Sequence, residues 1–206
     1  AVAEALVNMD PDTKEIYPVL LTTLPSVSSD RLTYSFTLKD DVKFHNGETL
    51  KSSDVKYTLT RMFLPETKAT SIDSFVYIKG SQDIIDGVAT ELSGVQVQDD
   101  THFTIELTQP YSTFLAMMSE FYAIIYPEKA CTEAGEAWGS GTTFIGTGPF
   151  RLESNDDSTE VVLAQDRLRS WPLFWTLQDG ADGGRRLVIS DDATAMRAAL
   201  SDPHLD

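Results

Sequence analysis

The sequence predicts an α/β fold of the mixed α+β kind, with short strands and short helices alternating along the chain. Residues 32–38 alternate apolar and polar side chains, and this period of two is typical of a half-buried strand. Residues 55–63 repeat apolar side chains at the spacing of one helix face. Turn-forming pairs such as Asn46-Gly47 separate these segments, so neither pattern extends over the whole chain.

The N-terminal part of the chain predicts two strands followed by a hairpin. Residues 7–16 are interpreted as a strand end and a Pro-Asp turn, and an apolar run follows over residues 16–24. A polar turn at residues 29–31 then precedes the alternating strand. We expect that strand to form the second arm of the hairpin.

The corner His45-Asn46-Gly47 follows this strand and precedes the first helix. Asn46 and Gly47 tolerate the positive φ angles that a tight turn needs, so we interpret the corner as scaffold rather than as a reactive site. The helix is expected to begin near Ser53. The hydroxyl of Ser52 or Ser53 can cap it by accepting a hydrogen bond from an early backbone N–H.

The rest of the chain predicts further short elements. In order, these are a short helix within residues 71–87, strands at 94–97 and 103–107, an amphipathic helix over 110–118, a buried strand at 121–126, a short helix within 127–138, strands at 148–153, 160–164 and 187–190, and a helix over 191–200. Residues 165–186 have the least regular pattern, because an acidic, glycine-containing loop interrupts them.

The composition argues against several classes of function. The 206 residues include 32 acidic and 16 basic side chains, and the resulting net charge of −16 would repel nucleic acid. Cys131 is the only cysteine, which rules out an intrachain disulfide and a cysteine-rich zinc site. No apolar run approaches the ~20 residues of a membrane-spanning helix, and the N-terminus lacks the pattern of a signal peptide.

No motif in the sequence assembles a catalytic or metal site. The three histidines do not stand at metal-ligand spacing, and we expect neither a metal nor a cofactor. The adjacent Asp pairs fall where strands turn or helices begin, positions at which backbone geometry favours Asp. Gly146-Thr147-Gly148 precedes Pro149 and a predicted strand, which favours a tight strand entry over a phosphate loop.

Four separated stretches of the chain form a set. They are LTYSFTLKDDVKFHNGETLKSSDVKYTLTRMF, LSGVQVQDDTHFTIELTQPYSTFL, FIGTGPFRLE and VISDDATAMRAALSDPHLD. In this order they resemble the signature of the family 5 extracellular solute-binding proteins, which are the oligopeptide, dipeptide and nickel receptors of ABC importers. The His-Asn-Gly corner matches a His-Asp-Gly of that signature. Lys51 departs from the pattern, because the family has a helix-capping Thr there, and this favours Ser52 as the cap.

The resemblance implies a type II periplasmic-binding-protein-like fold, in which two lobes clamp a ligand and an extra domain is joined to one lobe. Residues 1–143 would be the extra domain, and residues 144–206 would begin the first lobe. The second lobe would be missing, so the chain would be an N-terminal fragment that carries at most one wall of the cleft. We therefore expect the 206 residues alone to bind peptide weakly or not at all.

The resemblance also implies the function of an extracytoplasmic substrate-binding component of an ABC importer. Such a protein is a monomer in the periplasm or a lipoprotein at the cell surface. It captures a peptide or other small solute and delivers it to the membrane permease without a covalent step. Nickel, heme, saccharide and opine are alternative ligands, because their receptors share these motifs.

Phe75 is the one residue to which the resemblance assigns a ligand contact. Some peptide receptors place an aromatic side chain of the extra domain near the ligand, and the matching loop here is residues 71–77. Burial of Phe75 in the core is the alternative. Two other functions are kept as alternatives to the receptor: a secreted carboxylate-dependent hydrolase, and a sensory or interaction domain that reuses the fold.

Overall fold

We describe the protein from a computed structural model that covers residues 2–69, 72–139 and 143–150 with their side chains. Residues 151–152, 163–165, 174–179 and 185–190 are described as backbone. The helix predicted over residues 191–200 lies outside the described residues.

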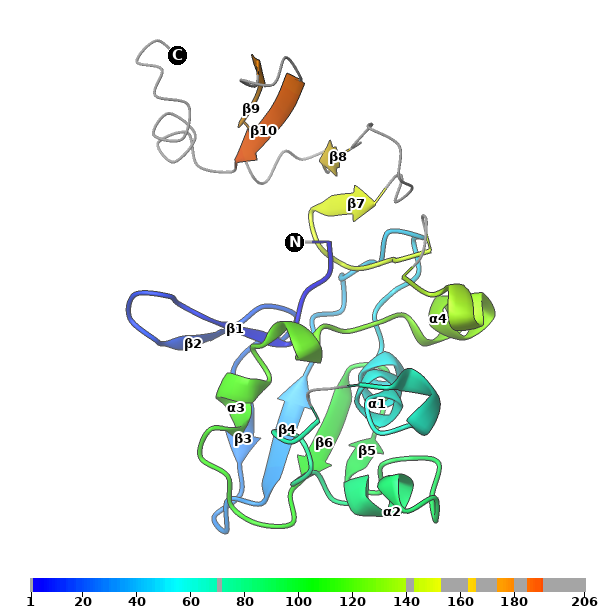
Figure 1. The fold of residues 1–206 in the computed structure, drawn as a ribbon. Helices are drawn as coiled ribbons and strands as arrows, with labels where there is room; N and C mark the ends of the chain where they lie inside the picture. Colours follow the sequence, from blue (N-terminus) through cyan, green and yellow to red (C-terminus); the bar gives the residue numbers. More distant parts are fainter. Residues whose placement is uncertain are drawn as a thin grey trace.

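Short strands and short helices follow one another along the described chain, as predicted (Figure 1). The strands are β1 (Val7–Met9), β2 (Ile16–Pro18), β3 (Ser26–Val27), β4 (Thr33–Thr37), β5 (Val95–Val97), β6 (His102–Glu106), β7 (Phe150–Leu152), β8 (Leu163–Gln165), β9 (Phe174–Asp179) and β10 (Arg185–Ser190). The α-helices are α1 (Ser52–Arg61), α2 (Ser81–Ile85), α3 (Phe114–Met117) and α4 (Glu128–Ala134), and the 3-10 helices are η1 (Pro65–Thr67), η2 (Phe121–Ala123) and η3 (Gly135–Ala137). The prediction of a mixed α/β fold is confirmed.

A four-stranded antiparallel sheet in the order β3-β4-β6-β5 forms the centre of the described fold. β3 and β4 form the predicted hairpin around a turn at residues 28–31. In β4, Tyr34 and Phe36 are buried while Ser35 between them is exposed, which is the predicted period of two. Helix α1 contacts β5, and the β1–β2 hairpin projects away from the sheet (Figure 1).

Aromatic rings occupy the middle of the core. Phe36 on β4 pairs directly with Phe103 on β6, and the centroids of their stacked rings lie 4.9 Å apart. Phe114 of α3 packs against Tyr34, with a centroid distance of 4.9 Å. Helix α1 adds Leu59, so the apolar face that the spacing predicts is the buried face. Each such side chain contributes roughly 1.5–3 kcal/mol through removal of its apolar surface from water.

Three predicted elements are wrong in length or type. The helix expected over residues 110–118 is reduced to the four residues of α3, because residues 111–114 form a turn closed by the Phe114 N–H. The buried strand expected over residues 121–126 is instead η2, followed by an extended piece. Finally, β9 lies within residues 165–186, where the sequence predicts the least regular structure.

Pairing with the N-terminal segment explains the extended piece after η2. The Ile125 N–H donates to the Glu4 carbonyl over 2.9 Å, and Ala5 and Ile124 form an isolated β-bridge. The apolar run is therefore divided, because its second half is covered by residues 4–5 and its aromatic first half remains on the surface. Within the described part of the chain, no helix combines the length and apolar character needed to span a membrane.

Candidate functional site

The corner at residues 44–47 is a tight turn, as predicted. Gly47 has a φ of +89°, and its N–H donates to the Phe44 carbonyl over 2.9 Å. The His45 ring uses both nitrogens on the backbone of a distant segment: Nε2 lies 2.7 Å from the Gly148 carbonyl, and the Gly146 N–H donates to Nδ1 over 3.3 Å. These contacts assign the hydrogen to Nε2. His45 therefore joins the corner to the Gly-Thr-Gly-Pro segment and acts as scaffold.

The Gly-Thr-Gly-Pro segment packs closely on the N-terminus. A Cβ at Gly146 would overlap the Val2 carbonyl oxygen and lie 2.6 Å from the Ala3 Cα. The Gly148 N–H donates to the same Val2 carbonyl over 2.9 Å. Strand β7 begins at Phe150, so the interpretation of this motif as a strand entry is confirmed.

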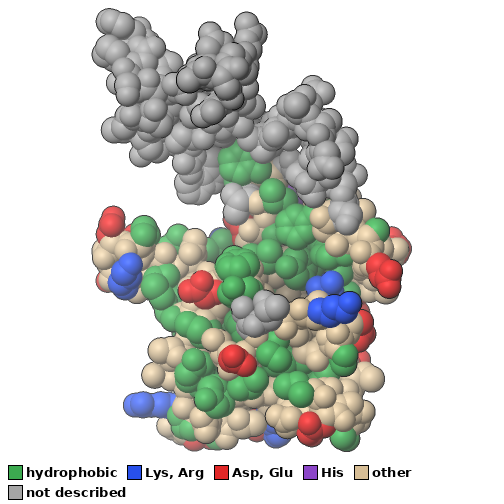
Figure 2. All heavy atoms as spheres, viewed as in Figure 1, with side chains coloured by type: hydrophobic (Ala, Val, Ile, Leu, Met, Phe, Trp, Pro, Cys, Tyr) green, Lys and Arg blue, Asp and Glu red, His purple; other side chains and the backbone are tan. Residues whose placement is uncertain are grey.

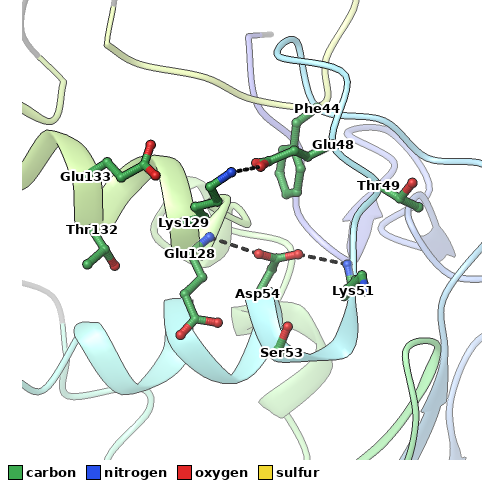
Figure 3. Close-up of a pocket in the computed structure, with 10 residues that line it drawn as sticks. All are labelled: Phe44, Glu48, Thr49, Lys51, Ser53, Asp54, Glu128, Lys129, Thr132 and Glu133. Carbon is green, nitrogen blue, oxygen red and sulfur yellow. Dashed lines mark hydrogen bonds and ion pairs between the residues drawn. The ribbon is translucent and has the colours of Figure 1, made fainter.

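A hollow of about 650 Å³ opens at the start of α1, next to α4 (Figure 3). Its lining residues are Phe44, Glu48, Thr49, Lys51, Ser53, Asp54, Glu128, Lys129, Thr132 and Glu133. The buried carboxylate of Asp54 joins two segments here, because it accepts the Lys51 N–H over 2.8 Å and the Glu128 N–H over 2.9 Å. Burial raises the pKa of the Asp54 carboxyl above its ordinary value, although both hydrogen bonds favour the ionised form. This arrangement holds α4 against α1 and is structural.

The Asp54 carboxylate corrects the prediction that Ser52 or Ser53 caps α1. Lys51 occupies the N-cap position, and no side chain accepts a hydrogen bond there in the manner of a capping serine. The Ser52 hydroxyl is buried without a hydrogen-bond partner among the described residues. Asp54 instead reaches back to the Lys51 N–H, which is the second half of a capping box.

Replacement of Asp54 by Asn is expected to lower the free energy of unfolding by about 1–3 kcal/mol, because the amide NH₂ would face one of the two N–H donors and leave it unsatisfied. Urea denaturation followed by circular dichroism measures the change. Asp83→Asn is the matched control, since Asp83 lies exposed in the first turn of α2. Equal losses in the two variants would contradict the assigned role.

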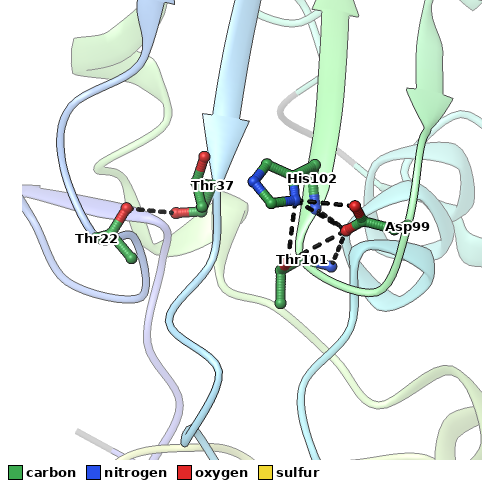
Figure 4. Close-up of polar contacts among 5 residues, drawn as sticks. All are labelled: Thr22, Thr37, Asp99, Thr101 and His102. Carbon is green, nitrogen blue, oxygen red and sulfur yellow. Dashed lines mark hydrogen bonds and ion pairs between the residues drawn. The ribbon is translucent and has the colours of Figure 1, made fainter.

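In the pair Asp99-Asp100, the Asp99 carboxylate holds its own turn. Asp99 accepts hydrogen bonds from the N–H groups of Thr101 and His102, over 2.8 and 2.7 Å (Figure 4). The Thr101 N–H, the His102 ring and the His102 N–H lower the pKa of the Asp99 carboxyl. Asp100 pairs with Lys51 over 2.9 Å. Across the described ranges, no group of three or more His, Cys, Asp or Glu side chains could hold a metal ion, while His204 lies outside those ranges.

An exposed pair of aromatic side chains lies on the described surface. Phe121 is 65% exposed and Tyr122 41% exposed, and their ring centroids lie 3.8 Å apart. Figure 2 shows hydrophobic side chains gathered on the face between the β1–β2 hairpin and α4. The sequence predicts the apolar run FYAIIY to be a buried strand, so this exposed pair is not expected from the sequence. The acidic Glu120 directly before the run is the signal that could have placed its first residues at the surface.

Two hollows flank this aromatic pair. One, of about 430 Å³, is lined by Ala3, Glu4, Ala5, Val7, Asn8, Tyr17, Val19, Ser119, Glu120, Phe121, Ile124, Pro149 and Phe150. The other, of about 250 Å³, is lined by Thr58, Arg61, Met62, Thr67, Lys68, Ala69, Phe121, Tyr122, Ile124 and Tyr126. Both hollows are concave and largely apolar with a few charged side chains, which is the composition typical of small-molecule sites.

The family model for bacterial extracellular solute-binding proteins, family 5 (middle region), matches residues 15–202. The chain belongs to this family. It is 34% identical over 133 residues to a dipeptide-binding protein of Lactococcus lactis subsp. cremoris, covering 63% of this chain and 24% of that protein. Listeria monocytogenes OppA bound to peptide superposes with a TM-score of 0.69 at 27% identity, covering 75% of this chain and 31% of that chain. Haemophilus influenzae OppA in complex with RPPGFSPFR superposes with a TM-score of 0.68 at 26% identity, covering 75% of this chain and 30% of that chain.

These likenesses confirm a type II periplasmic-binding-protein-like fold for this family 5 chain. The chain spans about a quarter to a third of the length of these relatives. The family is one of bacterial extracellular solute-binding proteins.

Phe75 lies in the core of this family 5 chain, at 1% exposed. Its N–H closes a turn on the Ile72 carbonyl over 2.8 Å, and this turn directs the ring inward. The structure thus shows burial, which is the alternative to a ligand contact at this position. A contact between Phe75 and ligand stays a prediction, whereas Phe121 and Tyr122 present aromatic surface without any rearrangement.

Proposed function

We propose that this chain is part of the extracytoplasmic solute-binding component of an ABC importer, which captures peptide-like solutes and hands them to a membrane permease. The observation that supports this most strongly is the family match over residues 15–202. Relatives that are described as dipeptide- or oligopeptide-binding favour a peptide over nickel, heme, saccharide or opine. The protein would work in the periplasm or, as a lipoprotein, at the cell surface.

In this proposal, residues 1–143 are the extra domain and residues 144–206 begin the first lobe. The His45 contacts to Gly146 and Gly148 would then fix the two parts to each other. The exposed aromatic pair and its two hollows are the part of the described surface that we assign to the ligand wall. Solute capture by closure of lobes needs no chemical step, so we propose a monomeric receptor without enzymatic activity or cofactor.

Isothermal titration calorimetry with apolar peptides of two to five residues tests this proposal. The complete gene product that contains these residues is expected to bind at least one such peptide with a Kd of about 10 µM or lower. Residues 1–206 alone are expected to bind the same peptide at least tenfold more weakly, because one wall of a clamp buries less of the ligand. Peptide binding of equal strength by residues 1–206 would contradict the clamp. Hydrolysis of a reporter glycoside or ester would favour the hydrolase instead.

A further inference from the structure

The corner at residues 44–47 contains the only Asn-Gly pair of the sequence. In such a pair the backbone nitrogen of the glycine can attack the side-chain carbonyl of the asparagine, because no Cβ on the glycine obstructs the approach. Asn46 and Gly47 are both exposed, and a Cβ at Gly47 would meet no atom within 4 Å, so the space around this peptide bond is open to water. The other asparagines, Asn8 and Asn155, precede residues whose side chains obstruct the same reaction.

The reaction of this pair is deamidation through a cyclic imide. The Gly47 nitrogen loses its proton and forms a bond to the Asn46 Cγ, and the side-chain amide leaves as ammonia, which takes up that proton. Water then adds to one of the two imide carbonyls and breaks its C–N bond, which gives aspartate or isoaspartate. The net change consumes a water molecule and releases ammonia, with no oxidation or reduction.

Three hydrogen bonds restrain the reacting groups in the folded corner. The Gly47 N–H donates to the Phe44 carbonyl over 2.9 Å, which stabilises the protonated nitrogen and opposes attack. The Asn46 Oδ1 accepts the Glu48 N–H over 3.1 Å, and its Nδ2 donates to the Glu48 Oε2 over 2.8 Å. An ionised carboxylate only accepts hydrogen bonds, so Glu48 holds the leaving nitrogen without being able to protonate it.

The Glu48 carboxylate has a second partner that keeps it in place. The Lys129 Nζ lies 3.2 Å from its Oε1 (Figure 3). The hydrogen bond from Asn46, followed by that from Lys129, lowers the pKa of the Glu48 carboxyl below its ordinary value. The group is therefore ionised at neutral pH, and its negative charge disfavours the amide anion that Gly47 must form for the attack.

We propose that Asn46 is a site of spontaneous deamidation, and that the Glu48 carboxylate restrains the reaction in the folded protein. The proposal goes beyond the receptor assignment and does not depend on it. Water is the sole co-reactant, so the modification needs no enzyme. It proceeds when the turn opens and the contacts of Asn46 with Glu48 are broken.

The two products alter the corner in different ways. Aspartate places a second carboxylate where the Asn46 Nδ2 now donates to Glu48, so two negative charges face each other. Isoaspartate adds a methylene to the main chain inside the turn that the Phe44 carbonyl and the Gly47 N–H close. His45 lies in the same turn and donates its N–H to the Gly146 carbonyl over 3.0 Å, so the isoaspartate form would displace this long-range contact as well.

Peptide mapping of the complete gene product by mass spectrometry tests the proposal. The protein is incubated in mildly alkaline buffer, either folded or in guanidinium chloride, and is then digested with trypsin at mildly acidic pH to limit conversion during preparation. Residues 44–51 form a tryptic peptide that reports Asn46, because Lys43 and Lys51 border it, and Asn8 is the internal control. Replacement of the amide by a carboxylate changes the peptide mass, and chromatography separates the aspartate and isoaspartate forms.

The denatured wild-type protein is expected to convert Asn46 and to leave Asn8 intact over the same period. The folded protein should convert Asn46 at least about tenfold more slowly, because the reaction requires opening of the turn. In the folded state, Glu48→Ala should raise the rate at Asn46 about threefold or more, since a hydrogen bond to the leaving amide is lost. Glu133→Ala is the matched control, because Glu133 lines the same hollow without holding Asn46, and its rate should equal that of the wild type.

Glu48→Gln is a second variant that keeps the size of the side chain while removing its charge, and it should raise the rate as well. Circular dichroism verifies that each variant is folded. Rates in both Glu48 variants equal to that of the folded wild type would overturn the role of Glu48. Conversion of Asn46 in the folded protein as fast as in guanidinium chloride would overturn the restraint, and equal conversion of Asn8 and Asn46 in the denatured chain would overturn the site. None of these results bears on the receptor assignment.

Discussion

Replacement of Phe103 by alanine is expected to lower the free energy of unfolding by about 3–5 kcal/mol, among the largest losses that a single core truncation causes. Phe103 is 0% exposed and stacks on Phe36, so removing its ring leaves a cavity at the centre of the sheet. Phe36 belongs to the neighbouring strand β4, so it cannot fill this cavity unless the backbone of that strand moves. This limits how far the site can collapse. Urea denaturation of the wild type and the variant measures the difference.

Thr104→Ala is the matched control for this prediction, because Thr104 follows Phe103 on the other face of β6 and is half-buried. Thr104→Ala should lower the free energy of unfolding by no more than about 1 kcal/mol. A double-mutant cycle with Phe36→Ala should also give a coupling of about 0.5–1.5 kcal/mol for the stacked pair. If Phe103→Ala costs no more than Thr104→Ala, the inner face of this sheet is not the main core.

Gly146→Ala is expected to lower the free energy of unfolding by about 1–3 kcal/mol, at the upper end of that range. The added Cβ would meet the Val2 carbonyl and the Ala3 Cα, which are backbone atoms and cannot rotate away. The N-terminal segment would have to move, and the two hydrogen bonds between Gly146 and His45 would move with it. Thermal or urea unfolding gives the loss directly.

Ala3→Gly provides a sharp control for the Gly146 variant. It removes the Ala3 Cβ, which would lie 2.6 Å from the new methyl group, but it leaves the Val2 carbonyl in place. The double variant Ala3→Gly/Gly146→Ala should therefore remain as unstable as Gly146→Ala. Restoration of stability in the double variant would show that the contact is with a side chain rather than with the backbone.

The regular parts of this fold are predictable from sequence because local rules and tertiary packing agree there. Tyr34 and Phe36 alternate with less buried polar residues, and the same period directs their rings to the core. Gly47 occupies a positive φ, as the Asn-Gly pair indicates. The apolar face of α1 is buried for the same reason.

The irregular parts depend on partners that are distant in sequence. Local rules favour the Ser52 hydroxyl as the cap, but the Asp54 carboxylate takes the Lys51 N–H and also binds the Glu128 N–H at the start of α4, a contact that is distant in sequence. Phe121 and Ile124 belong to one apolar run, yet residues 4–5 cover only its second half. Sequence periodicity alone cannot assign these contacts, so the aromatic pair emerges only from the structure.

The most direct test of the receptor assignment is native mass spectrometry of the complete gene product, purified from cells without denaturation. The proposal predicts a population whose mass exceeds that of the polypeptide by the mass of short peptides, which are released and sequenced on unfolding. Phe121→Ala/Tyr122→Ala should reduce that population. A protein that carries no releasable solute, and that takes up none from a peptide mixture added in excess, would contradict the assignment.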